Sequence, residues 1–393
     1  MDQRKPRFAG WWGVLLAFVL LALALHPGAT IVTGQSRRRP LVAAAPSQQP
    51  PGQARQAVAR VDGEAGAFPD FIAVPDGSVR GVAVDKTGNV YISVLIGNSA
   101  IEVRKFTPGG APVWSVNVGQ GNIGGLMVTP PGELYIALAA GANRGVWRMN
   151  RDGQELELVP GSDQIFFANG LVFDDVGTLW VTESTQKPIA LGSGQGAIWR
   201  VMRGGSAELC LRDDLLTGTG ALKNPVMLGA NGIAYYHGYL YITNTEKETV
   251  LRMPVWPDGS FGKLEPWMTL EDVKGSPLYK APLPVGGDGI ALDVYGNLYI
   301  AVVTRSAIVR VSLADKKQQT VAVFKGVSPV GPPPDARLDF PASLFFGTGK
   351  GERTNLFVTN SGQGKTLPSP ANQLPWVGSG LVKIDAGVPG RPQ

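Results

Sequence analysis

The chain has 393 residues, of which 44% are hydrophobic, and it contains 52 Gly, 31 Pro and a net charge of +5. Its single cysteine and two histidines exclude an internal disulfide framework and a Cys/His zinc cluster. Residues 1–60 contain eight Lys/Arg and one acidic residue, so they hold +7 and leave −2 for the rest of the chain. Because that remainder is nearly neutral, nothing in it favours nucleic acid as a partner.

The N-terminal stretch MDQRKPRFAGWWGVLLAFVLLALAL has the pattern of an export signal. Arg4, Lys5 and Arg7 precede an uncharged run over residues 8–25. A run of 18 residues lies between the length of a cleaved signal and that of a membrane-spanning helix. We therefore expect residues 1–34 to form a hydrophobic helix that is either a signal peptide or a membrane anchor. The rest of the protein should be exported, to the periplasm or the extracellular space.

The next segment, residues 35–67, is rich in Gln, Pro, Ala and Arg and contains QSRRRP and APSQQPPGQARQ. It lacks hydrophobic periodicity, which predicts a disordered linker. Residues 68–388 follow as one folded domain.

That domain repeats one pattern six times: an apolar alternating strand, a turn that contains Gly, and a second alternating strand. Period-2 alternation divided by a Gly turn predicts a β-hairpin. The copies are VRGVAVDKTGNVYISV (79–94), IGGLMVTPPGELYIAL (123–138), ANGLVFDDVGTLWVTE (168–183), ANGIAYYHGYLYITN (230–244), GDGIALDVYGNLYIAV (287–302) and PASLFFGTGKGERTNLFVTN (341–360).

A third strand follows each hairpin and has one basic residue at a constant place, which we interpret as a repeated surface position. These residues are Arg104, Arg148, Arg200, Arg252, Arg310 and Lys383. A fourth strand is visible after most copies, as in residues 111–118 and 319–326. The last copy leaves too few residues for a fourth strand, so we expect residues 68–77 to close the ring from the N-terminal side. The prediction is an all-β, six-bladed β-propeller of four-stranded blades, with a seven-bladed ring as the alternative.

In a propeller, the first strand of each blade lines the central channel, so the residues just before those strands should converge at one face. They are Arg80, Gly124, Asn169, Asn231, Asp288 and Ala342. Asn169, Asn231 and Asp288 have side-chain oxygens, which suit a hard cation such as calcium. The alternative is that Asn-Gly and Asp-Gly are ordinary turn dipeptides.

The second strand of each hairpin runs back to the same face. It should bring Glu183, Asn244 and Thr304 near the same rim, as outer residues of the site or contacts of a substrate.

The motifs ANGLVFDDVGTLWV, GANGIAYYHGYLYITNT, GGDGIALDVYGNLYIA and FPASLFFG…NLFVTNS resemble the SMP-30/gluconolactonase family, and more distantly the paraoxonase and strictosidine-synthase-like propellers. The resemblance covers about residues 70–385. It implies that Asn169, Asn231 and Asp288 bind a divalent cation, calcium first and Zn, Mg or Mn as substitutes. It also implies that Asp288 is the base, or the residue that orients water, in lactone hydrolysis.

This chain departs from the family pattern in the first blade, where Arg80 takes the place of the usual Glu. The site then holds metal only if Arg80 turns away or another acid, such as Glu183, moves in. Otherwise the cation is absent and Arg80 pairs with Asp288. His237 lies in a hairpin turn at the wrong end for a paraoxonase-type site or a Ser/His/Asp triad.

Two functions follow from these features. The first is an exported, metal-dependent lactonase-like hydrolase that acts on a sugar lactone or another small cyclic ester. The second is a non-catalytic propeller that binds a small ligand or a protein. A strictosidine-synthase-like condensation is a third possibility. The loops 216–229 and 274–287 run into Asn231 and Asp288, and should form the lid that selects the ligand.

Overall fold

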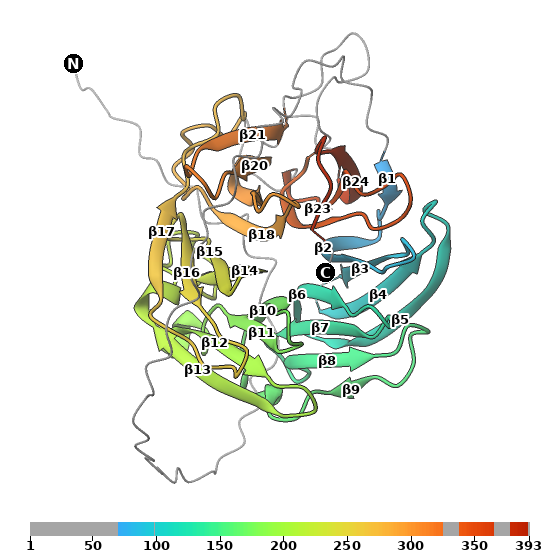
Figure 1. Cartoon of the computed structure of the whole chain (residues 1–393), viewed down its shortest axis with the longest axis horizontal. Helices are drawn as coiled ribbons and strands as arrows, with labels where there is room; N and C mark the ends of the chain where they lie inside the picture. Colours follow the sequence, from blue (N-terminus) through green and yellow to red (C-terminus); the bar gives the residue numbers. More distant parts are fainter. Residues whose placement is uncertain (1–69, 98, 325–337, 365–377, 392–393) are drawn as a thin grey trace, which may run out of the picture.

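The computed structural model describes residues 70–97, 99–324, 338–364 and 378–391, and in them the chain forms a six-bladed β-propeller (Figure 1). Each blade is one four-stranded antiparallel sheet, so the six-bladed prediction is confirmed and the seven-bladed alternative is wrong. The expectations for residues 1–34 and 35–67 fall outside the described residues. In the described part of the chain, no helix has the length and apolar character needed to cross a bilayer.

The blades follow one another along the chain, and the first strand of each lies innermost. Blade 1 consists of β2 (Gly77–Val84), β3 (Val90–Ile96), β4 (Ala100–Phe106) and β5 (Pro112–Gln120). Blade 2 consists of β6 (Asn122–Val128), β7 (Leu134–Ala139), β8 (Gly145–Met149) and β9 (Glu157–Leu158). Blade 3 consists of β10 (Ala168–Phe173), β11 (Leu179–Glu183), β12 (Gly196–Val201) and β13 (Ala207–Asp213).

Blade 6 closes the ring in the way the sequence predicts, because its outermost strand comes from the N-terminal side. Strand β1 pairs antiparallel with β24. Blade 4 consists of β14 (Ala230–Tyr236), β15 (Tyr239–Asn244), β16 (Thr249–Pro254) and β17 (Glu265–Thr269). Blade 5 consists of β18 (Gly287–Leu292), β19 (Leu298–Val302), β20 (Ala307–Val311) and β21 (Gln318–Val323). Blade 6 consists of β22 (Pro341–Phe346), β23 (Asn355–Ser361), β24 (Ser379–Asp385) and β1 (Asp70–Ala73).

Three of the six hairpin turns, those of blades 1, 3 and 5, depend on an aspartate at an equivalent position. Asp174 accepts backbone hydrogen bonds from Val176 and Thr178, at 3.1 and 2.8 Å, and its other oxygen accepts one from the Trp180 indole at 3.0 Å. Asp85 and Asp293 bind the backbone of their own turns in the same way. These side chains satisfy turn N–H groups that the ladder leaves unpaired, and so they fix where each hairpin reverses. The core lies between the blades, where aromatic residues of the second strands, such as Trp180, are fully buried.

Each inner strand contains a β-bulge at the position of the candidate site residues. The register shifts between Val79 and Val82 in β2 and between Gly287 and Ile290 in β18, with equivalent shifts in β6, β10, β14 and β22. The expectation that these residues precede the strand is therefore wrong. They lie within it, and the bulge turns their side chains out of the regular alternation.

The second residue of the bulge is glycine in five blades, and it lets neighbouring inner strands approach closely. A Cβ on Gly170 would lie 2.5 Å from the Asn231 carbonyl oxygen, and one on Gly232 would collide with the Asp288 carbonyl oxygen. Side-chain hydroxyls join the same strands. Thr182 accepts from Gly170 N and donates to Asn231 O, at 2.7 and 2.5 Å.

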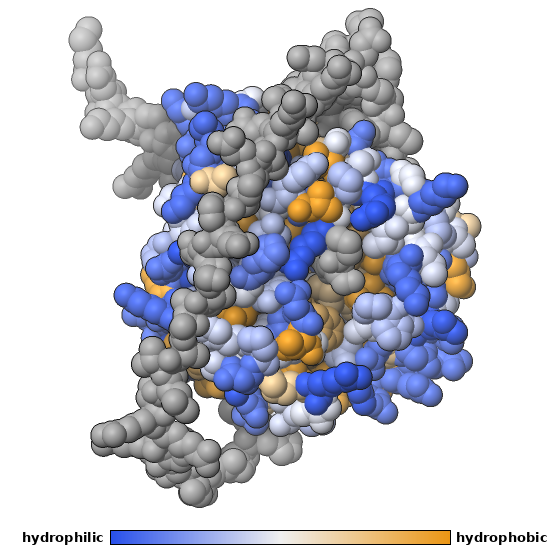
Figure 2. All heavy atoms as spheres, in the orientation of Figure 1, coloured by the Kyte–Doolittle hydropathy of each residue, from blue (hydrophilic) through white to orange (hydrophobic). Residues whose placement is uncertain are grey.

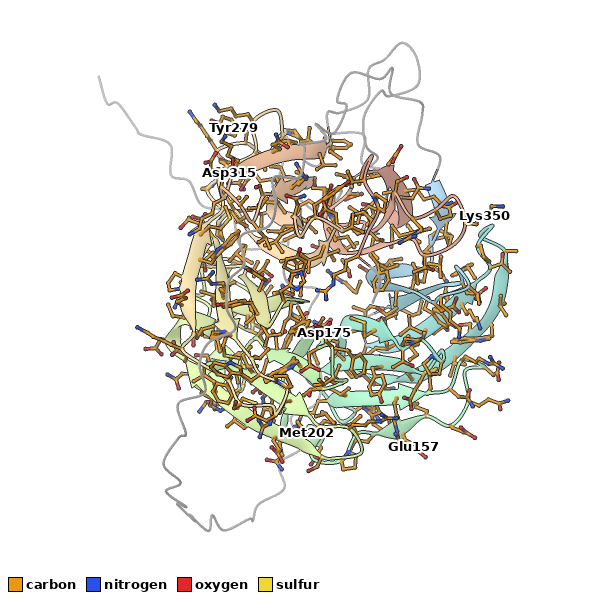
Figure 3. The ribbon with its side chains drawn as sticks, in the orientation of Figure 1. Glu157, Asp175, Met202, Tyr279, Asp315 and Lys350 are labelled. Atoms are coloured by element: carbon orange, nitrogen blue, oxygen red, sulfur yellow. The ribbon has the colours of Figure 1, made fainter. Side chains whose placement is uncertain are left out.

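The end of the described chain, at Arg391, crosses the opposite mouth of the channel. Arg391 N donates to Leu292 O, and its guanidinium donates to Tyr235 O and to the Asp175 carboxylate. Asp175 lies near the middle of the ring in Figure 3, whereas Glu157 lies at its rim. On the face seen in Figure 2, hydrophilic residues cover most of the rim and hydrophobic residues appear in the central hollow.

The basic residues of the third strands do not form a charged ring around the channel. Each pairs with a carboxylate at an N–O distance of 2.5–3.7 Å. The pairs are Arg104–Asp76, Arg148–Glu157, Arg200–Glu208, Arg252–Glu265, Arg310–Asp293 and Lys383–Glu352. Except for Arg310–Asp293, whose carboxylate is fully buried, these pairs are partly exposed and add little to stability.

The bulge glycines lead to a graded prediction for stability. Gly232→Ala should lower the free energy of unfolding by about 2 kcal/mol or more, because the new methyl group collides with backbone that cannot move away. The matched control is Gly125→Ala at the equivalent position, where the nearest atom, Asn169 O, lies 3.2 Å from the added Cβ. Urea denaturation measures both. Equal effects would show that the inner strands are not held this tightly.

Candidate functional site

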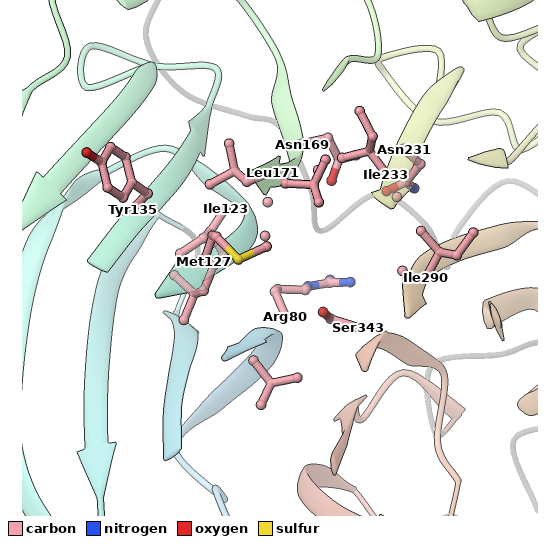
Figure 4. Close-up of a pocket in the computed structure, with 18 of the residues that line it drawn as sticks. Arg80, Ile123, Met127, Tyr135, Asn169, Leu171, Asn231, Ile233, Ile290 and Ser343 are labelled. Carbon is pink, nitrogen blue, oxygen red and sulfur yellow. The ribbon is translucent and has the colours of Figure 1, made fainter. Parts of the chain in front are cut away.

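Four of the predicted site residues meet at one end of the channel. Arg80, Asn169, Asn231 and Asp288 come from β2, β10, β14 and β18, and all line a cavity of about 1120 Å³. Figure 4 shows Arg80 reaching into the middle of the channel, with Asn169 and Asn231 on the facing wall and Ser343 beside it. The bulge explains this convergence, because the same local distortion occurs at the same height in every blade.

A hydroxyl of the same blade fixes each of the two amides, and that hydroxyl donates in turn to the next blade. Asn169 Nδ2 donates to Ser184 Oγ at 3.1 Å, and that hydroxyl donates to Ala230 O at 2.6 Å. Asn231 Nδ2 donates to Thr245 Oγ1 at 2.9 Å, and that hydroxyl in turn donates to a backbone carbonyl of blade 5. Because both amide nitrogens are engaged with the wall, the amide oxygens are left as the acceptors of this pair.

Asp288 and Arg80 form the charged part of the site. Loss of hydration raises the pKa of Asp288 to about 7, while the positive charge of Arg80 and a hydrogen bond with Asn231 act in the opposite direction. Loss of hydration also lowers the pKa of Arg80 to about 10, against the attraction of Asp288. Arg80 is therefore still a cation at neutral pH, and Asp288 is poised between its two protonation states.

The residues present do not fit a divalent cation. Asp288 supplies one carboxylate, Asn169 and Asn231 supply neutral oxygens, and Arg80 adds a positive charge that cancels that of the carboxylate. Within the described residues, no group of three or more His, Cys, Asp or Glu side chains could hold a metal. At about 6 Å and an effective dielectric near 20, the guanidinium would repel a divalent ion by roughly 5 kcal/mol. The expected calcium site therefore lacks the charge that calcium needs.

Glu183 does not face the channel, so it cannot supply the missing charge. Its carboxylate is fully buried and accepts hydrogen bonds from Phe166 N, Trp199 Nε1 and Arg212 Nη1, at 2.8, 2.9 and 3.0 Å. Burial raises the pKa of Glu183, and the bonds to Trp199 and Arg212 oppose that rise. Its contacts indicate that Glu183 holds the entry to blade 3 in place.

Asn244 and Thr304 fix the two loops expected to form the lid. Asn244 Nδ2 donates to the carbonyls of Leu215 and Thr217, at 2.8 and 3.1 Å, and the side chain is fully buried. The Thr304 hydroxyl accepts from Gly286 N and donates to Pro284 O, at 2.9 and 2.6 Å. Thr304 also lines the cavity, but its hydroxyl is engaged with the loop.

The chamber above the site is mainly apolar. Apolar side chains from both loops and from the blades face it, among them Phe167, Val226, Leu228, Leu283 and Phe340. The loop 216–229 is further held by Glu246, which accepts from the backbone of Thr219 and Gly220. An apolar wall with a few convergent polar groups is the usual form of a small-molecule site.

Asn224 is a residue of this chamber that the sequence did not single out. It is 9% exposed and lines the cavity, and its Oδ1 has no hydrogen-bond partner in the described structure. A buried acceptor without a partner is costly, so it marks a place for a donor group of a ligand. The sequence signal was only the length of its loop. His237, in contrast, lies between β14 and β15, at the end of the hairpin away from Asn231.

Comparisons with known proteins show the fold. No model of a protein family and no curated protein sequence matches the chain. Among solved structures, the chain is similar to a calcium-binding regucalcin from Agrobacterium tumefaciens, with a TM-score of 0.55, 15% identity, and coverage of 83% of this chain and 96% of that one. It is also similar to a putative gluconolactonase, with a TM-score of 0.54, 16% identity, and coverage of 83% of this chain and 96% of that one. For a gluconolactonase from Xanthomonas campestris the TM-score is 0.50 and the identity 15%, with coverage of 81% of this chain and 88% of that one.

These structural neighbours are thus gluconolactonase and regucalcin proteins of the SMP-30 group, and they are similar to this chain in fold at low sequence identity. What the chain shares with them is the six-bladed propeller.

Proposed function

We propose that the protein is a lactonase-like hydrolase that acts on a small cyclic ester in the propeller channel. The observation that carries this proposal is the convergence of Arg80, Asn169, Asn231 and Asp288 on the wall of the cavity of about 1120 Å³. The similarity in fold to gluconolactonases supports it. In this proposal Asp288 takes one proton from water, and the amide oxygen of Asn169 or Asn231 accepts a hydrogen bond from the other O–H and so orients that water.

The lining of the chamber supports a substrate with apolar substituents, rather than a sugar lactone. A sugar lactone has several hydroxyl groups, each of which needs a partner when it leaves water. The described chamber has a few polar side chains, among them Asn122, Asn224 and Gln363, beside a larger number of apolar ones such as Phe167 and Val226. The proposed substrate is therefore an alkyl-substituted lactone with few polar groups.

The second candidate is a protein that binds such a ligand without hydrolysing it. The opposite charges of Arg80 and Asp288 favour it, because an aspartate neutralised by arginine is a weaker base. Binding without turnover over the whole lactone panel below would establish this candidate and reject hydrolysis.

A lactone series tests the substrate class. For γ-lactones of increasing side-chain length, kcat/KM should rise about fourfold per methylene, since each buried CH₂ contributes about 0.8 kcal/mol. The rise should stop when the chain fills the chamber. A polyhydroxylated lactone is the matched control, and it should be the poorest substrate of the purified full chain. A preference for that control would contradict the apolar assignment.

The pKa of Asp288 predicts how the stability of the protein depends on pH. The folded protein holds this proton up to about pH 7, whereas the ordinary value is 3.8, so the free energy of unfolding falls as pH rises through this range. The Asp288→Asn variant should therefore have a higher free energy of unfolding than the wild type at pH 8, and the difference between the two should be smaller at pH 4. It should also remove hydrolysis.

Thermal denaturation at several pH values measures this difference. Asp152→Asn, at an exposed carboxylate, is the control and should change little at any pH. If the Asp288→Asn variant is less stable than the wild type at pH 8, then burial of the ionised Asp288 carboxylate does not destabilise the folded protein.

We also propose that the protein is exported, with residues 8–25 as signal or anchor. A fusion of residues 1–67 to alkaline phosphatase, which is active only outside the cytoplasm, should be active. Replacing two leucines of the hydrophobic run with arginine should abolish that activity. Activity that survives this change would reject the export proposal. Fractionation then separates a cleaved signal from a retained anchor.

A further inference from the structure

We propose that Arg80 takes the place of a divalent cation in this site, so that its guanidinium binds the carbonyl oxygen of the ester. The catalytic part of this inference rests on the proposed ester hydrolysis, while the metal-free part stands on the site alone. Arg80 would then be both the positive charge of the reaction and the reason that no divalent ion binds.

The first support is the position of Arg80 in the fold. Its carbonyl accepts a hydrogen bond from Thr359 Oγ1 at 3.0 Å, and the same hydroxyl accepts from Ser343 N at 2.8 Å. The preceding residue, Val79, donates through its N–H to Ser379 Oγ at 2.9 Å. Hydrogen bonds to blade 6 thus fix the backbone of β2 at Val79 N and Arg80 O, and so they fix the point from which the Arg80 side chain enters the channel.

The second support is the surroundings of the guanidinium. It reaches the middle of the channel, past Ile123 and Met127 of blade 2 and toward the wall that holds Asn231 (Figure 4). Met127 and Ile123 are buried apolar residues. The charge of Arg80 acts on Asp288, and that of Asp288 acts on Arg80. A planar cation with five donors suits a carbonyl oxygen that becomes negative.

The third support is the balance of charge. One carboxylate and one guanidinium leave the four convergent residues neutral. A divalent ion placed among them would add two uncompensated charges in a channel with apolar walls. A neutral lactone adds none. The same four residues thus disfavour the ion and accept the ester.

The reaction that follows needs no metal. Water gives a proton to the Asp288 carboxylate as its oxygen bonds to the carbonyl carbon, and the π-electron pair moves to the carbonyl oxygen. Arg80 N–H groups donate hydrogen bonds to that oxyanion. When the pair returns, the ring C–O bond breaks, and the leaving alkoxide takes the proton from Asp288. Lactone and water become one hydroxy acid.

The test compares the full chain with two variants at this position. Arg80→Met removes the charge at similar length, and Arg80→Glu reverses it, which gives two carboxylates and two amide oxygens, a set that suits calcium. Lys350→Glu makes the same change of net charge at the rim (Figure 3) and serves as the control. Elemental analysis and thermal denaturation, with calcium chloride and with chelator, are measured for each.

We expect the wild type to contain no stoichiometric divalent ion and to show the same melting temperature with calcium and with chelator. Arg80→Glu should gain a calcium-dependent rise in melting temperature, and the double variant with Asp288→Asn should lose it. Lys350→Glu should behave like the wild type. Arg80→Met should lower kcat/KM about 10²- to 10³-fold, as expected for loss of an oxyanion donor.

A stoichiometric ion or a calcium-dependent shift in the wild type would overturn the inference, even if the protein hydrolyses lactones. A folded Arg80→Glu variant that gains no calcium binding would also overturn it, because another feature would then exclude the ion. Full activity of Arg80→Met would reject the catalytic role of Arg80. A metal-free wild type that hydrolyses no lactone would leave the metal-free site intact and reject the proposed function.

Discussion

The close approach of the six inner strands is the constraint on which the site depends. Glycine at the second bulge position removes the side chain that would separate neighbouring blades, as at Gly232 beside the Asp288 carbonyl. Hydroxyls such as Thr182 and Thr243 then bond across the gap to the backbone of the next blade. The residue before each glycine turns into the channel as a consequence. The same close packing of the inner strands therefore closes the ring and brings the site residues together.

The chemistry follows from which residues occupy those positions. Asp288 and Arg80 lie among apolar walls, where each loses hydration and each is stabilised by the other. That arrangement costs folding free energy, and it keeps a carboxyl and a guanidinium ready for a neutral substrate. The loops above them add an apolar chamber and one acceptor without a partner, Asn224. Charge, shape and burial all disfavour a divalent ion and favour an ester with apolar substituents.

Much of this fold could be predicted from the sequence, because the hairpin pattern is local. Alternation of apolar residues and the aromatic residue of each second strand recur in every blade, and ring closure by residues 68–77 follows from counting strands. The convergence of Asn169, Asn231 and Asp288 followed from the same repeat. The bulge could not be predicted, because Asn-Gly and Asp-Gly serve equally well in turns. Glu183 and Asn244 lie at the expected rim, next to Ala168 and Ala230, but their hydrogen bonds to Arg212 and Leu215 could not be predicted, since those partners lie far along the chain. The closure of the far mouth by Arg391 also depends on distant contacts.

A crystal structure of the full chain, grown with calcium chloride and the hydroxy acid product of an alkyl lactone, tests the central claim most directly. The account predicts the product carboxylate within hydrogen-bond distance of the Arg80 guanidinium, its alkyl group against Phe167 and Val226, and no ion among Asn169, Asn231 and Asp288. A calcium ion coordinated by those three side chains, with Arg80 turned out of the channel, would contradict it.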